Sequence, residues 1–351
     1  MNNKNIIFDK VNNFINGYAC VCIDNLHGVI NTNGEFVIKP KYHFLENING
    51  KYFIAKNTND NKFGVIDIDD NVIIPLVNNN IEAFSEEDTY FIVTRDNLIC
   101  VMNSKQEEII TNGKYEFITY CGSEPTYLMA KKDKFYGVID ISENIYIPFE
   151  YSSIEFYDYK FIAGKDNTYG VLDNNNNLIE PFTADKETLY FKLNQIQYNN
   201  SKQTEIIPNF DTNKYRYVGE FSKIKGKPFD SIAKVSNFDI QSIYDNWNPL
   251  EQSYEEHKKE FYCKFGLVDN NGNLIIPCLY DGETPTWYFN NLICISKNGK
   301  YGFIDWNNNI VVEFIYDEIL LLNDNDEFLI VKKDEKYGFV DRQGNLLNIK
   351  S

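Results

Sequence analysis

The sequence predicts an all-β fold made of tandem antiparallel repeats of about 36 residues. Two observations lead to this prediction. An aromatic-glycine motif recurs along the chain: KYGFID at 300–305 returns as KYGFVD at 336–341, 36 residues later. The stretches between copies consist of short apolar runs separated by turn residues. A fixed period of this length is typical of propellers and solenoids.

Nine copies of the motif can be placed. Seven keep the glycine, at Gly28, Gly64, Gly137, Gly170, Gly266, Gly302 and Gly338. Six of these are followed three residues later by an aspartate: Asp67, Asp140, Asp173, Asp269, Asp305 and Asp341. Two copies are decayed, with Cys100 at one and Gln197, eleven residues before Pro208, at the other. The units are therefore anchored at 28, 64, 100, 137, 170, 197, 266, 302 and 338.

Each unit has the same internal order. An apolar run such as 328–331 comes first, and a polar turn leads to the aromatic-glycine strand. A turn rich in Asn and Gly, as at 270–273, is a hairpin signal. The next strand is rich in Ile and commonly closes on Pro, and a Tyr three residues later starts a fourth stretch. Four strands of about five residues fit in one unit.

This pattern resembles the WG (tryptophan-glycine) repeat family of bacterial proteins, whose motif has an aromatic-glycine pair, a following Asp, an "IIP" strand and a "YD" element. The similarity extends from about Gly17 to Asn348, with Phe or Tyr in place of the Trp. Such a resemblance implies a repeat scaffold and no particular reaction.

The repeated residues have structural explanations. The first strand of each unit is apolar on both faces, so we expect neighbouring units to cover it from both sides. Glycine in a packed strand indicates a close approach, here expected from the ring or backbone of the adjacent unit. Since Cys100 takes this place in one unit, replacement by Ala should be mild. The Asp three residues later is expected to close the hairpin through an Asx turn rather than bind calcium or substrate.

The chain is predicted to be one continuous repeat domain: repeats over 1–236, a helical insertion over 237–262, and repeats over 263–351. Asn248, Pro249 and Glu251 favour a helix at about 249–261. Its candidate partner-binding residues lie on one side: Leu250, Tyr254, His257 and Phe261. The helix either covers a sheet edge or contacts a specific partner. The basic segment 214–230 is expected to be a solvated loop.

The two ends of the chain suggest closure. Residues 8–11 (FDKV) resemble the Tyr-Asp stretch that finishes a unit, whereas the last unit stops before it. An N-terminal strand would then complete the last sheet, as in propellers that seal their ring. Nine units exceed the usual four to eight blades, so an open curved array remains the alternative.

Composition and charge limit the function. The 351 residues include 34 Lys and Arg against 51 Asp and Glu, a net charge of −17. Such a field disfavours nucleic acid and anionic membranes as ligands. No signal peptide or apolar span is recognisable, and the seven cysteines suggest reduced thiols in the cytoplasm. Cys20 and Cys22 would share a strand face, but neither they nor the three His residues have the spaced partners of a metal site or triad.

We therefore expect no catalytic residues, no cofactor and no metal. The predicted function is a non-enzymatic, acidic, cytoplasmic scaffold for protein–protein interaction, with a partner that is another protein, basic in character, and an inhibitor or immunity-type protein as one example. The alternative is a carbohydrate-binding or carbohydrate-cleaving protein, since Tyr residues and paired carboxylates are abundant. Exposed aromatics beside two carboxylates in one pocket would favour the alternative.

Overall fold

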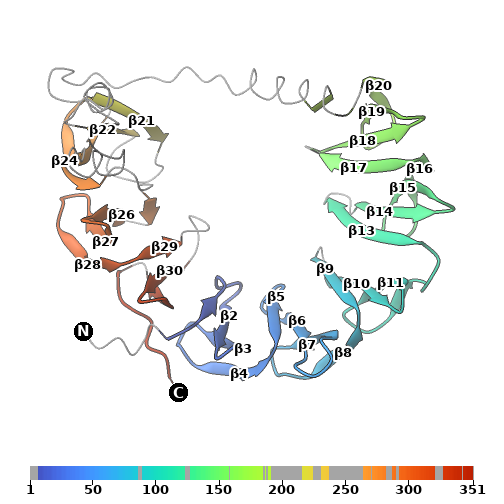
Figure 1. Cartoon of the computed structure of the whole chain (residues 1–351), viewed down its shortest axis with the longest axis horizontal. Helices are drawn as coiled ribbons and strands as arrows, with labels where there is room; N and C mark the ends of the chain where they lie inside the picture. The colour runs from blue at the N-terminus through green and yellow to red at the C-terminus, as the bar shows by residue number, and fades with distance from the viewer. Residues whose placement is uncertain are drawn as a thin grey trace, which may run out of the picture.

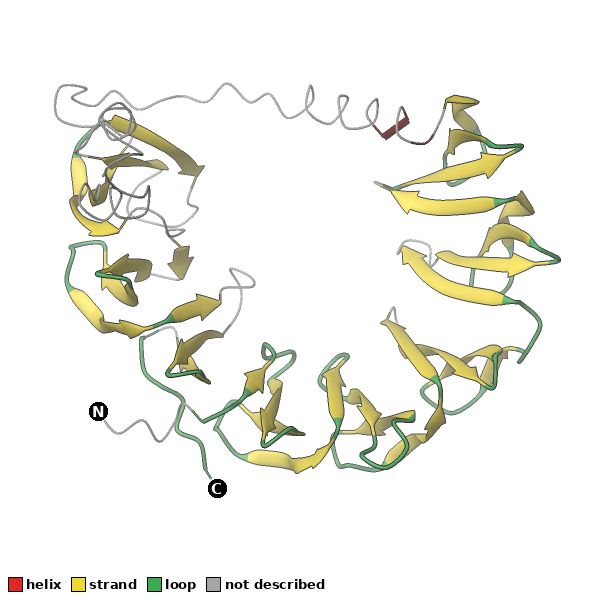
Figure 2. Cartoon of the chain, in the orientation of Figure 1, coloured by secondary structure: helices red, strands yellow, loops and turns green. Residues whose placement is uncertain are grey.

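The computed structural model describes residues 7–85, 89–122, 127–157, 159–184, 186, 189–190, 216–223, 231–236, 264–269, 271–281, 287–289, 292–320, 327–341 and 343–350. Apart from the helical residues 186, 189 and 190, its regular elements are β-strands, grouped in eight small antiparallel sheets (Figure 2). The all-β prediction is confirmed. The expected helix at about 249–261 lies outside the described residues. The described part of the chain contains no helix with the length and apolarity that a membrane crossing requires.

The first five sheets follow the first five units. They contain β1 (Lys10–Val11), β2 (Tyr18–Ile23), β3 (Leu26–Asn31) and β4 (Phe36–Tyr42); β5 (Phe44–Asn47), β6 (Tyr52–Lys56), β7 (Phe63–Asp67) and β8 (Val72–Asn78); β9 (Asn80–Ser85), β10 (Thr89–Arg95), β11 (Leu98–Asn103) and β12 (Glu108–Ile110); β13 (Phe117–Gly122), β14 (Tyr127–Lys132), β15 (Phe135–Ile139) and β16 (Ile145–Tyr151); and β17 (Ser153–Tyr157), β18 (Lys160–Lys165), β19 (Thr168–Leu172) and β20 (Leu178–Ala184).

The remaining three sheets follow the units at Gly266, Gly302 and Gly338. They contain β21 (Arg216–Lys223), β22 (Ser231–Ser236), β23 (Lys264–Asp269) and β24 (Leu274–Asp281); β25 (Trp287–Phe289), β26 (Leu292–Lys297), β27 (Lys300–Asp305) and β28 (Ile310–Tyr316); and β29 (Glu318–Leu320), β30 (Phe328–Lys333) and β31 (Lys336–Asp341). The ninth unit, at Gln197, lies outside the described residues. β22 pairs with β23, so the stretch 237–263 joins two neighbouring strands of one sheet. Part of the basic segment 214–230, expected to be loop, forms strand β21.

The repeated glycine is needed at a bulge within its own sheet. Opposite Gly302, β28 takes two extra residues, because Tyr301 pairs with Tyr316 while Phe303 pairs with Val312. A Cβ on Gly302 would lie 2.7 Å from the carbonyl oxygen of Val312. The corresponding distances at Gly64 and Gly137 are 2.5 and 2.8 Å. The close approach therefore comes from the fourth strand of the same unit, and the expected approach by the adjacent unit is wrong.

The same bulge occurs in five further sheets, always opposite a motif glycine: Gly28, Gly64, Gly137, Gly170 and Gly266. Proline fits there because a bulged residue of an edge strand need not donate to the ladder. The unit with Cys100 in place of the glycine has a different fourth strand. Its fourth strand, β12, ends at Ile110, and the Gly113 amide then donates to the carbonyl of Ile99, so the bulge with two extra residues is not formed opposite Cys100. The presence of Cys100 therefore does not imply that Ala is tolerated at the glycines.

Two-residue turns join the second and third strands of most sheets. The turn at Asp24 and Asn25, for example, has φ of 51° and 63°. Asp and Asn tolerate this left-handed conformation, which matches the twist of a hairpin. The other turns with two such residues are Asp96-Asn97, Asp133-Lys134, Asp166-Asn167, Asn298-Gly299 and Asp334-Glu335.

Consecutive sheets stack face to face, and their buried side chains form the core. Cys20 and Val29 of the first sheet pack with Phe53 of the second, and Leu292 packs with Leu329 across a later pair. We call each such contact a seam. Because both faces of a middle strand enter a seam, β6 and β26 are buried nearly throughout, as predicted. Figure 1 shows the sheets following one another around an arc, with fourth strands such as β4, β8 and β28 on its outer side.

The two ends of the chain meet between the last sheet and the first. Phe8 forms an antiparallel bridge with Tyr337, and Leu346 forms one with Val340. The last sheet therefore gains a composite fourth strand from the C-terminal tail and the N-terminal segment. Lys350 in turn donates its amide to the carbonyl of Gly34 in the first sheet at 2.8 Å. The predicted pairing of the N-terminal segment with the last sheet is confirmed at this seam, which we call the closing seam.

The succession of described sheets instead stops between β20 and β21, which lie apart in Figure 1. On the β20 side, Leu189 packs on Ile162 and Val171, which would otherwise form an open face of the fifth sheet. Lys186 forms an ion pair with Glu155 at 2.6 Å, and the Tyr190 hydroxyl hydrogen-bonds to the same carboxylate. These residues cover part of this face of the fifth sheet.

Candidate functional site

The repeated aspartates hold the loop between the third and fourth strands, here called the Asx loop. Asp305 Oδ1 accepts the backbone N–H groups of Asn307 and Asn309, at 2.9 and 2.8 Å, and its Oδ2 accepts Asn309 Nδ2 at 2.8 Å. Asp140, Asp173, Asp269 and Asp341 make the same three bonds. Asp67 accepts the amide and side-chain N–H groups of Asn71. These are the bonds of an Asx turn, so each carboxylate is already occupied.

The variant units keep the same geometry with exchanged roles. Asn31 and Asn103 replace the Asp, and Glu35 and Glu107 replace the Asn four residues later. Asn31 Nδ2 donates to the Glu35 carboxylate at 3.0 Å, whereas in the other units the Asp carboxylate accepts. The exchange of donor and acceptor shows that the bond within the loop, rather than a negative charge at this position, is the common feature.

A lysine–aspartate link connects neighbouring units on the opposite side of the sheets. Asp281 accepts Lys264 Nζ at 2.6 Å from its own sheet and Gly299 N–H at 2.8 Å from the next turn. Asp317 makes equivalent bonds with Lys300 and with the N–H of Asp334. At the closing seam Asp9 does the same with Lys336 and with the N–H of Asp24. Hydrogen bonding to these lysines and amides holds the pKa of Asp9 and Asp317 below the ordinary value.

A third link uses the Tyr that starts each fourth stretch. The Tyr42 hydroxyl donates to Asp70 Oδ1 at 2.7 Å, and that of Tyr280 donates to Asn308 Oδ1 at 2.6 Å. Each acceptor has a left-handed backbone in the Asx loop of the next unit. At the closing seam the equivalent loop residue is Gly34. The Tyr is replaced there by Phe8, which has no hydroxyl. This hydrogen bond was not predicted from the sequence. Its acceptor can nevertheless be located there, because it lies three positions after each Asx residue.

His27 and His43 have local partners, and Cys20 is buried. The ring of His27 packs 6.1 Å from that of Phe44, and burial, with Lys10 and His43 adding to it, lowers its pKa. His43 Nδ1 lies 2.8 Å from Asn61 Oδ1. Burial raises the pKa of the Cys20 thiol to about 12, so it stays protonated. Within the described ranges, no group of three or more His, Cys, Asp or Glu side chains is clustered closely enough to hold a metal ion.

The predicted site residues therefore separate into two sets. The glycines and aspartates lie within the sheets, with Gly338 buried in β31, and they serve the repeat geometry. The candidate partner-binding residues Leu250, Tyr254, His257 and Phe261 lie outside the described residues.

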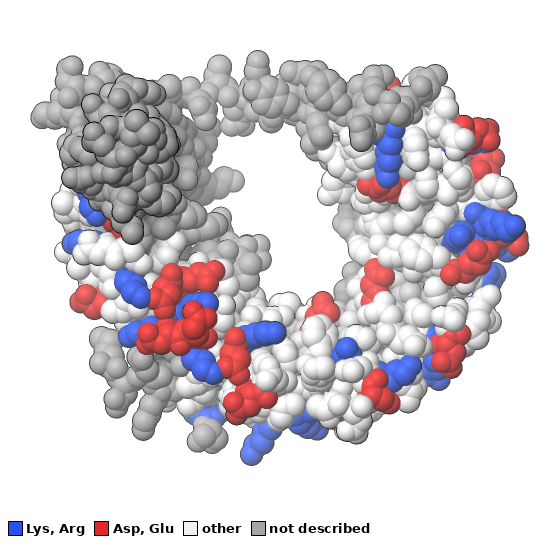
Figure 3. Space-filling view, in the orientation of Figure 1, with Lys and Arg blue, Asp and Glu red and all other residues white. Residues whose placement is uncertain are grey.

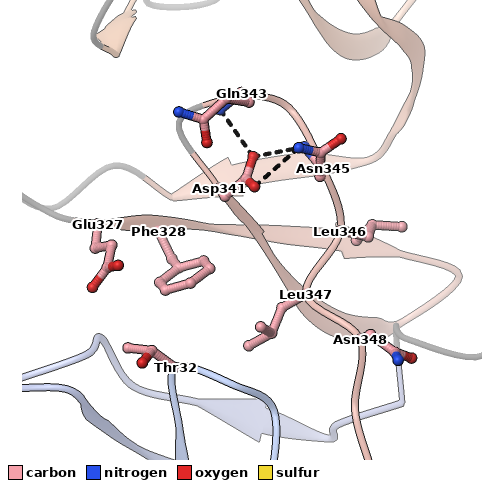
Figure 4. A pocket seen from close by; sticks show the side chains of 9 residues that line it. All are labelled: Thr32, Glu327, Phe328, Asp341, Gln343, Asn345, Leu346, Leu347 and Asn348. Atoms are coloured by element: carbon pink, nitrogen blue, oxygen red, sulfur yellow. Dashed lines mark hydrogen bonds between the residues drawn. The ribbon is translucent and has the colours of Figure 1, made fainter.

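The closing seam contains a cavity of about 360 Å³ (Figure 4). Phe328, Leu346 and Leu347 supply its apolar wall, and Thr32, Glu327 and Asp341 supply polar groups. In Figure 4, Thr32 of the first sheet and Phe328 of the last sheet lie on opposite sides of the opening. We call this cavity the closing pocket. Asp341 is bound in its Asx turn, whereas Glu327 is exposed and has no hydrogen-bond or ion-pair partner among the described residues.

The fold and these contacts define a tandem-repeat β protein with propeller-like stacking of four-stranded sheets. The family model described as "WG containing repeat" matches residues 5–26, 28–62, 265–301 and 301–337. These four regions of the chain therefore match the WG containing repeat, the resemblance that the sequence motif predicted.

No curated protein matches the chain in sequence. Among solved structures, a eukaryotic initiation factor is 9% identical, with a TM-score of 0.37, covering 97% of this chain and 87% of that one. Kluyveromyces lactis Hsv2 is 8% identical, with a TM-score of 0.33 and coverage of 95% and 96%. Apo AztD from Citrobacter koseri is 11% identical, with a TM-score of 0.29 and coverage of 96% and 92%. Likeness this low provides no information about ligand or activity.

Proposed function

We propose that this chain is a non-enzymatic scaffold that binds another protein through its surface. The observation that supports this proposal is the occupation of the repeated carboxylates: each makes the hydrogen bonds of an Asx turn or a lysine–aspartate link. A general acid or nucleophile must be free to exchange a proton or attack a substrate. The repeat positions are therefore committed to structure, and recognition is left to surfaces that vary between units.

Charge favours a basic partner. The net charge of −17 attracts cationic surfaces and accelerates their encounter. On the face shown in Figure 3, carboxylates gather over the last and first sheets, with lysines between them. An inhibitor or immunity-type protein directed against a basic toxin is one form such a scaffold would take. The six cysteines that the structure describes are free thiols, which agrees with a proposed location in the cytoplasm.

The closing pocket gives the carbohydrate alternative one supporting observation, because it places Phe328 beside Glu327 and Asp341. A sugar ring stacking on Phe328 would find hydrogen-bond acceptors at its rim. Hydrolysis would need two available carboxyl groups, and Asp341 already accepts three hydrogen bonds. The pocket therefore favours sugar binding over sugar cleavage within this alternative.

Partner isolation followed by a binding measurement tests the proposal. The immobilised chain is used to recover proteins from its native cell, and each is purified and measured on a biosensor at 0.05 and 0.5 M salt. We expect a basic protein whose association slows as salt rises, because screening shortens the range of attraction. Binding to an oligosaccharide panel, without a protein that binds in purified form, would reject the scaffold proposal in favour of the alternative.

A further inference from the structure

The closing pocket lies where a side chain that fills three other seams is replaced by a smaller one. The position directly after the Asx residue holds Ile68, Ile141 and Trp306 in three units. Each packs against the preceding sheet, and Trp306 is only 8% exposed. In the first unit this position is Thr32, which lines the closing pocket instead of filling it.

The opposite wall is also less complete at this seam. The residue paired with the Asx aspartate is Tyr52 in one sheet and Leu292 in another, and these are 7% and 6% exposed. Its equivalent, Phe328, pairs with Asp341 and is only half-buried. Ser104, which holds the Thr32 position in the next unit, interacts with the hydroxyl of Tyr52. Phe328 has no hydroxyl with which to bridge to Thr32.

From these comparisons we infer that the closing pocket receives an aromatic side chain of a bound protein segment, with a cationic residue of that segment beside Glu327. This inference rests on the proposed scaffold function and names the site and chemistry of recognition. The inserted ring would occupy the space that Trp306 fills in its own seam, against Phe328 and Leu347. A volume of about 360 Å³ lies in the range of ligand sites, about 300–1,000 Å³.

The charge at the rim of the closing pocket is the reason for expecting a cationic residue beside the inserted aromatic side chain. Glu327 is exposed at the pocket edge, and within the described ranges it has no ion-pair partner. An aromatic anchor in a pocket provides most of the affinity of such a contact, while a charged rim contact adds selectivity and a modest gain. A segment with lysine on either side of tryptophan combines the two features.

The test uses the full chain and a blocked lysine–tryptophan–lysine tripeptide. Binding is followed through the methyl NMR signals of Leu346 and Leu347. We expect saturable shifts, and at least about tenfold weaker binding when alanine replaces the tryptophan of the probe. The variant Thr32→Trp should fill the pocket and abolish these shifts. Asn174→Trp is the matched control, because Asn174 holds the same repeat position in the fifth unit, away from the pocket, and should bind as the wild type does.

A second variant, at an exposed residue, tests the inference without disturbing the packing of the closing seam. Glu327→Gln changes an exposed side chain and should weaken the lysine-containing probe about threefold, with no effect on blocked tryptophan alone. Three results would overturn the inference: no saturable shift with the tripeptide at about 5 mM, binding that survives Thr32→Trp, or saturable shifts with an oligosaccharide but not with the tripeptide. If a purified protein partner binds while these methyl signals stay unchanged, the inference fails and the scaffold function stands.

Discussion

Phe8 and Tyr337, from opposite ends of the chain, exchange both hydrogen bonds of an antiparallel bridge. The amide of Phe8 donates to the carbonyl of Tyr337 at 3.2 Å, and the amide of Tyr337 donates back at 2.9 Å. The ring of Phe8 is fully buried and lies 6.2 Å from that of Phe339 and 6.5 Å from that of Phe36. One N-terminal residue therefore contributes to both the last and the first sheet, and it joins sheets that the sequence places farthest apart.

The closing seam should depend strongly on this residue. We expect Phe8→Ala to lower the free energy of unfolding by about 3–5 kcal/mol, because it leaves a cavity between two sheets. Hydrogen exchange should accelerate in β31 and in β2 and β3. Phe135→Ala is the control, since Phe135 is 46% exposed in a comparable strand and should change stability by about 0.5 kcal/mol or less. Unchanged exchange in β31 would contradict end-to-end pairing.

The bulge predicts that even a methyl group is harmful at the motif glycines. Gly302→Ala should cost about 1–3 kcal/mol, since its Cβ would lie 2.7 Å from a backbone oxygen that cannot rotate away. Gly302→Val should cost about 2–4 kcal/mol. Cys100→Ala provides the comparison, because the bulge with two extra residues is not formed opposite that position, and should cost about 1 kcal/mol or less. Urea melts measure all three, and a Gly302→Ala variant as stable as the wild type would refute the bulge explanation.

The lysine–aspartate link predicts a stability loss in acid. The pKa of Asp9 is lowered by the hydrogen bond from Lys336 and by the N–H of Asp24. A group with a lowered folded-state pKa stabilises fully above its unfolded pKa, about 4 for Asp, and loses this contribution as pH falls through the folded value. Urea melts from pH 6 to about 2 should therefore show a steeper loss for the wild type than for Asp9→Asn. Glu313→Gln, an exposed change in β28, should retain the wild-type slope, and an equal slope for Asp9→Asn would contradict the link.

The insertion should be removable without loss of the fold. It joins β22 and β23, which are already paired, so a short turn in place of about 240–260 leaves their ladder intact. We expect unchanged thermal unfolding and weaker binding of the natural partner, because inserted segments are where specificity is added to a scaffold. Biosensor measurements decide the second point. Full affinity after excision would assign the insertion to covering the sheet edge.

The repeat, the four-stranded unit, the Asx turn and the end-to-end closure were predictable from sequence because each depends on contacts at a regular spacing. Asp305 and Asn309 lie four residues apart, and residues 8–11 resemble the stretch that finishes other units, such as 316–319. Local geometry fixes which backbone groups such residues can reach. By contrast, the sequence could not show which strand approaches Gly302, because glycine only signals that something does.

Tertiary structure alone decided the closing pocket. Thr32 and Phe328 are unremarkable in sequence, and only the stacking of the first sheet on the last places them across one cavity. The sequence does show that Thr32 occupies the repeat position of Ile68 and Trp306, but a small residue leaves a space only where no neighbour moves in to fill it. That outcome depends on how two sheets from opposite ends of the chain pack together, and packing between distant segments is set by the summed fit of many side chains rather than by a local pattern.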